Sequence, residues 1–444
     1  MAEIYDLVLR GGTVVSHDGI APTEIGIRDG RIAEIGPIDR NSAGRTIDVT
    51  GLHILPGVID SQVHFREPGG EHKEDLASGS QAAVLGGVTT VFEMPNTDPL
   101  TTSAAALADK LTRARGRMWC DHAFYVGGTV ENVNDIPELE RLPGSAGIKV
   151  FMGSSTGDLL IDNEAGLAAI LSKISRRAAF HAEDEARLKA RAGLRIEGDP
   201  ASHPVWRDPE AALMATRRLV RMAEAAGKRI HVLHISTAEE IKFLAGHKRL
   251  VTCEATPQHL SLTAPGAYAD HGTHAQMNPP VRDAANMAAI WRGVKSGIID
   301  VLGSDHAPHT LEEKARPYPA SPSGMPGVQT LVPLMLSHVN AGRMSLQRFV
   351  DLTAHGPQRI FGIAGKGRIA VGYDADFTIV DLKRRQTISP DWLVSRAGWS
   401  PFSGLEVTGW PVGTIIRGNP VMWEGELQGR PSGVPVVFDQ ARPV

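Results

Sequence analysis

Cysteine is nearly absent from this chain of 444 residues, which contains only Cys120 and Cys253. So few cysteines exclude a disulfide framework and a thiolate metal cluster. The sequence also lacks an uncharged run long enough to span a membrane, and it does not open on a basic segment followed by an apolar one. Neither sign of charge dominates, because 46 Lys and Arg stand against 50 Asp and Glu. We therefore expect a cytoplasmic protein that binds neither nucleic acid nor membranes.

The remaining composition is that of a globular protein rich in turns. Hydrophobic residues make up 42% of the chain and charged residues 22%, and there are 47 Gly and 29 Pro. A chain of this length can form one domain of barrel size together with a smaller one.

Both ends of the chain resemble short strands joined by tight turns. Strand-like runs at 25–28 and 31–35 flank Asp29-Gly30, and a pair of turn residues that accepts positive φ is a strong hairpin signal. Similar runs recur near the other end of the chain. We therefore predict a small composite β-sandwich domain made from residues 1–55 and 366–444.

The middle of the chain alternates between apolar strand-like runs and helix-like stretches. Eight buried strands alternating with helices predict an α/β fold, a (β/α)₈ TIM-like barrel, which we place at residues 56–365. The predicted strands are 58–63, 88–94, 122–126, 147–152, 178–181, 229–234, 251–255 and 299–304.

Polar side chains follow the first predicted barrel strand in the run Gln62-Val63-His64-Phe65-Arg66. Alternate residues of a strand point to the same side, so Gln62, His64 and Arg66 share a face. This face offers metal ligands and a cation that can hold an anion. For Arg66 alone, a surface salt bridge with Glu67 or Glu71 is an equal alternative.

Further reactive residues fall at other strand ends, where the active site of such a barrel forms. A single histidine beside an apolar strand is usually structural. Lys149, however, lies among apolar residues, and a buried ammonium is costly unless it is paired or chemically altered. Asp305 ends an apolar strand and needs a partner for the same reason. Together with His181 and His234, these residues predict a metal site.

Motifs along nearly the whole chain support this interpretation. They resemble those of the dihydroorotases of the long, barrel-plus-sheet type, which belong to the amidohydrolase superfamily. The matching motifs include His64-Phe65-Arg66-Glu67-Pro68-Gly69, Lys73-Glu74-Asp75, Met94-Pro95-Asn96-Thr97, His181-Ala182-Glu183-Asp184, Asn278-Pro279-Pro280 and Ser304-Asp305-His306-Ala307-Pro308-His309.

The resemblance implies a role for each matching residue. One or two zinc ions would be bound, the more buried one by His64, with Gln62 standing where the family has its first histidine. His181 and His234 would bind the second zinc ion. Lys149 matches a lysine that many relatives carboxylate with CO₂ to bridge the metals. Asp305 would bind zinc and shuttle a proton, and the substrate would be bound by Arg66, Asn96, Asn278 and His309.

The implied activity is that of a dihydroorotase, the reversible zinc-dependent hydrolysis of dihydroorotate to N-carbamoyl-aspartate in pyrimidine biosynthesis. Two cations would acidify a bridging water for attack on the ring amide, and Arg66 would hold the substrate carboxylate. The partner is then a small-molecule substrate. Because relatives are commonly dimers or tetramers, the resemblance also implies a homo-oligomer.

Gln62 leaves several alternatives open, because a neutral amide is a poor zinc ligand. The buried metal would still bind through His64, Lys149 and Asp305, or the enzyme would work with a single zinc at His181 and His234. A third alternative is a catalytically silent subunit that partners aspartate transcarbamoylase. A hydantoinase-like or allantoinase-like specificity is a close variant of the dihydroorotase activity.

A span rich in Gly, Pro and Ser follows the last predicted strand, between His309 and Leu331. Such a span suits a mobile cover over the substrate or an ordinary surface loop, and the sequence leaves both open.

Overall fold

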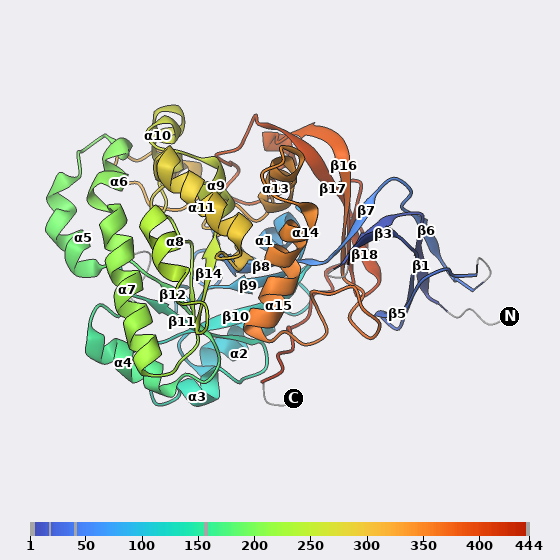
Figure 1. Ribbon diagram of the computed structural model, residues 1–444, viewed down its shortest axis with the longest axis horizontal. Coiled ribbons are helices and arrows are strands. Elements are labelled where there is room, and N and C mark those ends of the chain that lie inside the picture. Colours follow the sequence, from blue (N-terminus) through green and yellow to red (C-terminus); the bar gives the residue numbers. More distant parts are fainter. Residues whose placement is uncertain (1–4, 17–18, 40–41, 155–158, 441–444) are drawn as a thin grey trace.

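A barrel of parallel strands forms the centre of the computed structural model, which describes residues 5–16, 19–39, 42–154 and 159–440 (Figure 1). Neighbouring strands pair in sequence order, from β8 to β15. A parallel bridge between Val63 and His306 joins the two edges, with the His64 amide donating to the His306 carbonyl at 2.7 Å. The strands are β8 (Val58–Val63), β9 (Val88–Glu93), β10 (Asp121–Gly127), β11 (Ser145–Phe151), β12 (Ala178–His181), β13 (Ile230–Val232), β14 (Val251–Ala255) and β15 (Val301–Leu302).

The predicted fold class is confirmed, and each predicted strand has a counterpart in the barrel. Two strands are shorter than expected, because β13 ends at Val232 and β15 at Leu302. Beyond these ends, His234 and Asp305 adopt positive φ values of 37° and 45°. This backbone leaves the extended conformation and cannot continue a strand.

Helices flank the barrel on its outside (Figure 1). Their start points follow from capping residues: Asp208 accepts a hydrogen bond from the Ala211 amide, and Asp283 accepts one from the Asn286 amide. Alanine and leucine side chains of the longest of these helices are buried against the barrel. The main flanking helices are α1 (Leu76–Leu85), α2 (Ala104–Ala114), α4 (Glu164–Lys173), α7 (Pro209–Ala225), α8 (Ala238–Leu244), α11 (Ala284–Ser296) and α13 (Leu331–Asn340).

Two further sheets lie beside the barrel (Figure 1). One contains β1 (Leu7–Arg10), β4 (Ile25–Arg28), β5 (Arg31–Ile35) and β6 (Thr46–Asp48). The other contains β2 (Thr13–Val15), β3 (Ile20–Pro22), β7 (His53–Pro56), β16 (Phe377–Thr387), β17 (Glu406–Ile416), β18 (Asn419–Trp423) and β19 (Glu426–Leu427).

Strands from both ends of the chain meet in the second sheet, where β7 pairs antiparallel with β16. The predicted hairpin at Asp29-Gly30 is present as β4 and β5, and both turn residues have positive φ. The division into residues 1–55 with 366–444 and residues 56–365 stays a prediction.

The chain after β19 returns to the barrel. The amides of His122 and Val436 donate to the carbonyls of Val434 and His122, respectively, beside the start of β10. Val436 and Phe438 are buried in a cluster with barrel residues that include Phe92. Within the described residues, no helix is both long and apolar enough to cross a membrane.

Candidate active site

A cavity lies where the barrel strands end, and most of the predicted site residues line it. Eight of the ten do so, and the other two, Asn96 and His309, lie behind the lining in contact with it. The lining consists of Gln62, His64, Arg66, Lys149, Phe151, His181, His234, Asn278, Asp305, Ala307, Ser323 and Gly324.

The first group of polar side chains gathers around Asp305. Its Oδ1 accepts a hydrogen bond from Gln62 Nε2 at 2.9 Å and lies 3.2 Å from His64 Nε2. The other ring nitrogen of His64 is 2.8 Å from Asn96 Oδ1. Asn96 therefore orients the imidazole and leaves Nε2 to face Asp305. Burial is the main cause that lowers the pKa of His64, which favours the neutral ring that ligates metals.

The second group is a histidine pair, with His181 Nδ1 3.0 Å from His234 Nε2. Glu183 Oε2 lies 3.0 Å from His181 Nε2, and Arg207 donates to the same carboxylate at 2.6 Å. The carboxylate fixes the proton of His181 on Nε2, so the Nδ1 lone pair points at His234. Burial is the leading cause that lowers the pKa values of both histidines.

Lys149 is fully buried beside these two groups. Its Nζ has no hydrogen-bond partner among the described residues and lies 4.2 Å from the centre of the Phe151 ring. Burial lowers the pKa of Lys149 to about 7, so a neutral amine is available near physiological pH. An unpaired buried amine is a costly arrangement, and it indicates a partner that completes the site.

The two groups fit divalent zinc if Lys149 contributes a further ligand. Two imidazole nitrogens on tetrahedral zinc lie roughly 3.3 Å apart, close to the His181–His234 separation. Within the described part of the chain, no three His, Cys, Asp or Glu side chains are grouped so that they hold a metal by themselves. The first group thus offers two donors, His64 and Asp305, and the second offers His181 and His234. A carbamate on Lys149 would add an oxygen to both groups.

Arg66 supplies a positive charge at the cavity wall. It is buried, its Nε donates to the Pro308 carbonyl at 3.2 Å, and its guanidinium lies 3.4 Å from His309 Nε2. Among the described residues, no carboxylate oxygen lies within 4.0 Å of the guanidinium. Burial lowers the pKa of Arg66 to about 10, so it stays charged at neutral pH. The alternative of a surface salt bridge with Glu67 or Glu71 does not describe this residue.

The family profile of the amidohydrolases matches residues 53–421. This chain belongs to the amidohydrolase family. It is 37% identical to a dihydroorotase of Methanosarcina mazei, with 96% of each chain covered, and 38% identical to one of Halobacterium salinarum, with 90% of this chain and 96% of the relative covered. The resemblance to dihydroorotases is thereby confirmed.

Hydantoin-cleaving enzymes are also similar to this amidohydrolase. An L-hydantoinase of Paenarthrobacter aurescens is 33% identical, with 96% of each chain covered. A solved structure of the L-hydantoinase from Arthrobacter aurescens superposes with a TM-score of 0.91 at 31% identity, covering 96% of this chain and 98% of the other. The fold therefore does not separate the two substrate classes.

The backbone of the amidohydrolase is strained at its cavity. Arg66, His234 and Asp305 all have positive φ, at 64°, 37° and 45°. Such conformations are unfavourable for residues other than glycine and persist where the surroundings enforce them, often at functional sites. All three residues are among those predicted for the site.

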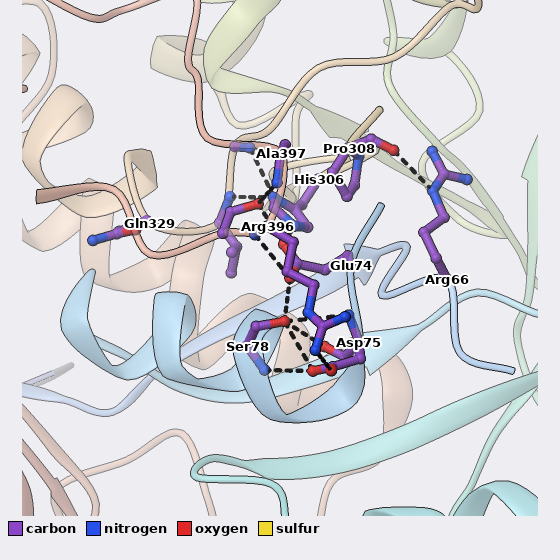
Figure 2. A network of polar contacts seen from close by, with 12 residues as sticks. Arg66, Glu74, Asp75, Ser78, His306, Pro308, Gln329, Arg396 and Ala397 are labelled. Carbon is purple, nitrogen blue, oxygen red and sulfur yellow. Dashed lines mark hydrogen bonds and ion pairs between the residues drawn. The ribbon is translucent and has the colours of Figure 1, made fainter. Parts of the chain in front are cut away.

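A second layer of polar contacts supports the cavity from behind (Figure 2). Glu74 is fully buried, and its Oε2 lies 3.3 Å from His306 Nε2. The Gly327 amide donates to the other ring nitrogen of His306 at 3.0 Å, so the proton of this ring is on Nε2. Ser395 and the Arg396 amide donate to Glu74 as well. Glu74 thus connects three distant segments of the chain beside Asp305.

Sequence reasoning missed the functional importance of Glu74 and Glu183. Both lie within the motifs that carry the family resemblance, but neither ends a barrel strand in a position that faces a metal. The signal for Glu183 is its spacing of two from His181, since a carboxylate beside a ligating histidine often fixes the ring.

Proposed function

We propose that this amidohydrolase is a dihydroorotase, which catalyses the reversible hydrolysis of dihydroorotate to N-carbamoyl-aspartate. The observation that carries the proposal is the buried guanidinium of Arg66, which faces the cavity without a carboxylate partner among the described residues. Dihydroorotate carries a carboxylate on its cyclic amide ring, whereas hydantoin and dihydrouracil do not. A planar guanidinium binds a carboxylate through two parallel hydrogen bonds.

The metal site of this proposal uses the two groups described above. His181 and His234 would hold one zinc ion, His64 and Asp305 are the candidates for a second, and carboxylated Lys149 would contribute oxygen to both. Bound zinc acidifies water and polarises an amide carbonyl. The neutral amine of Lys149 is the form that reacts with CO₂, which supports the carboxylation.

The residues of the chain perform the remaining chemistry. Asp305 accepts the proton of the attacking water and delivers it to the ring nitrogen as the amide bond breaks. Hydrogen bonding from Gln62 keeps its carboxylate in place for this transfer. Arg66 and Asn278 hold the substrate, and His309 and Asn96 keep Arg66 and His64 in position. In the reverse direction, the same proton transfer closes the ring.

The test compares dihydroorotate with dihydrouracil, which has the same ring but no carboxylate. The wild-type enzyme is expected to prefer dihydroorotate, and Arg66→Met is expected to lower kcat/KM for dihydroorotate by roughly 100-fold or more. Turnover of dihydrouracil should change little, which controls for misfolding. A wild-type preference for dihydrouracil or hydantoin would overturn the proposal, and absence of turnover with zinc bound would favour the silent-subunit alternative.

Gln62 bears on the number of metal ions. Its Nε2 donates to Asp305 and has no lone pair for a cation, and its Oε1 is a weaker ligand than imidazole. We expect one tightly bound zinc ion per chain, at His181 and His234. Elemental analysis after dialysis against a weak chelator checks the stoichiometry, and Gln62→His should raise it to two. Two tightly bound ions in the wild-type protein would show that Gln62 does not weaken the first group.

The family resemblance also supports a cytoplasmic homo-oligomer, and the silent-subunit alternative adds a complex with aspartate transcarbamoylase. Light scattering of the purified protein, alone and mixed with that enzyme, tests the oligomer and the complex.

A further inference from the structure

Lys314 is another buried lysine, and it is not among the predicted site residues. Its side chain is fully buried, and its Nζ donates to the carbonyls of Gln276 at 3.3 Å, Pro322 at 2.9 Å and Gly324 at 3.1 Å. Among the described residues, no carboxylate oxygen lies within ion-pair distance of this ammonium. Three carbonyl acceptors therefore satisfy its three protons.

These contacts join two separate segments. We call residues 321–324 the strap. The Gly324 amide donates to the Gln276 carbonyl at 2.8 Å, and the Gln276 side chain bonds to the Ser321 carbonyl and to Ser323 Oγ at 3.1 and 3.0 Å. Gln276 lies two residues before Asn278, which lines the cavity. Lys314 thus fixes the strap against the segment that carries a predicted substrate ligand.

The strap forms part of the cavity wall through Ser323 and Gly324. A Cβ atom on Gly324 would lie only 2.5 Å from the Ala307 carbonyl oxygen, and φ at this residue is 138°. The Ser323 carbonyl is 3.0 Å from Nε2 of His309, the histidine that contacts Arg66. The strap therefore packs directly against the groups proposed to bind the substrate.

We propose that Lys314 is a positioning residue for the substrate: it holds the strap closed as a preformed wall, and thereby sets the affinity for the cyclic amide rather than the rate of bond cleavage. This inference rests on the proposed dihydroorotase function. The span 310–330 is then a fixed wall in the binding-competent enzyme and not an ordinary surface loop. Without the ammonium, the carbonyls of Gln276, Pro322 and Gly324 each lose one donor, and the strap is displaced for part of the time.

The test is Lys314→Met, which keeps the length of the side chain and removes the charge and the protons. The matched control is Lys228→Met, since Lys228 also donates to a backbone carbonyl, that of Ile174 at 2.7 Å, away from the cavity. If the strap is closed in about a tenth of the variant molecules, KM for dihydroorotate rises about tenfold while kcat changes less than about twofold. Zinc content should stay the same.

Hydrogen exchange of the Gly324 amide provides a readout that does not depend on activity. Exchange should be at least about tenfold faster in Lys314→Met than in the wild type and unchanged in Lys228→Met. Gln276→Met removes the side-chain bonds to the strap and should act in the same direction, which keeps the test valid if Lys314→Met fails to fold.

A loss of kcat at unchanged KM, or unchanged Gly324 exchange in the variant, would overturn the proposal. If the wild-type protein does not turn over dihydroorotate, the proposed function fails. The exchange measurement still decides whether Lys314 holds the strap, and KM is then measured with the cyclic amide that is turned over.

Discussion

Glu183 shows how one buried residue can control the chemistry of another. Its carboxylate accepts from His181 and from Arg207 and is completely shielded from solvent. Burial alone would raise the pKa of Glu183, but Arg207 and His181 lower it well below its usual value, so the group is ionised at neutral pH. The ionised form is the one that fixes the His181 tautomer.

Replacing Glu183 by Gln should therefore weaken zinc binding by 10- to 100-fold, which is the usual effect of removing an outer hydrogen-bond partner of a ligating histidine. Competition with a chromophoric chelator measures the dissociation constant. Glu240→Gln is the matched control, because Glu240 is also a buried carboxylate but accepts from Thr216 and Thr237 instead of a predicted ligand. Equal zinc affinity in the two variants would contradict the assigned role.

Eight of the ten predicted site residues line one cavity, and the patterns that made them predictable can be named. Lys149 stands out because a charged residue interrupts an apolar strand, and Gln62, His64 and Arg66 stand out through their alternation. The hydrogen bond from Gln62 to Asp305 joins residues 243 positions apart, so no local pattern reveals it. The same holds for Lys314, whose neighbours in sequence suggest an ordinary helical lysine.

At the scale of elements, Glu74 holds three segments that arrive from different parts of the chain. It precedes α1, faces His306 after β15, and accepts from Ser395 and Arg396, as Figure 2 shows. Replacing Glu74 by Ala leaves several buried donors without an acceptor, each at a cost of about 1–3 kcal/mol. Because some of these donors will find water, we expect a loss of about 3 kcal/mol in the free energy of unfolding.

Urea denaturation of Glu74→Ala followed by circular dichroism measures this loss. Glu131→Ala serves as the control, since Glu131 is exposed and should change the stability by less than about 0.5 kcal/mol. A similar free energy of unfolding for both variants would show that the three segments are held by other contacts.

The barrel strands were predictable because each is an apolar run, and six of the eight contain or closely precede a predicted site residue. Their exact lengths were not, as β13 and β15 show. His234 and Asp305 have positive φ values and line the cavity, and the sequence of either strand alone contains no sign of this backbone.

At the scale of the whole molecule, a buried charge cluster joins the barrel to the neighbouring sheet. Asp121 at the start of β10 pairs with Arg417, which follows β17, and lies 2.6 Å from Lys366 Nζ. Lys366 also contacts Asp374 and Asp376 just before β16, at 2.9 and 2.7 Å. The strand-like runs at both chain ends predicted a composite sheet. They did not predict this junction, because Asp121 is more than 200 residues away in sequence from the other members.

The junction also makes the free energy of unfolding depend on pH. Burial opposes ionisation of Asp121, but Lys366 and Arg417 outweigh it and lower its pKa below the ordinary value of 3.8. A carboxylate with a lowered folded pKa contributes stability that is complete above about pH 4 and is lost as pH falls through the folded pKa. Asp121→Asn removes this contribution and should cost about 2 kcal/mol at neutral pH, since Lys366 keeps two other carboxylates.

Urea denaturation of the wild type and Asp121→Asn at several pH values checks this expectation. The difference in free energy of unfolding should stay constant from about pH 8 to pH 5 and shrink below about pH 4, where Asp121 takes up a proton in the unfolded chain before it does so in the folded protein. Asp391→Asn, at an exposed position, should show no such pattern. A difference that grows toward low pH would mean that Asp121 is protonated in the folded protein, and the barrel and sheet would then be joined mainly by apolar packing.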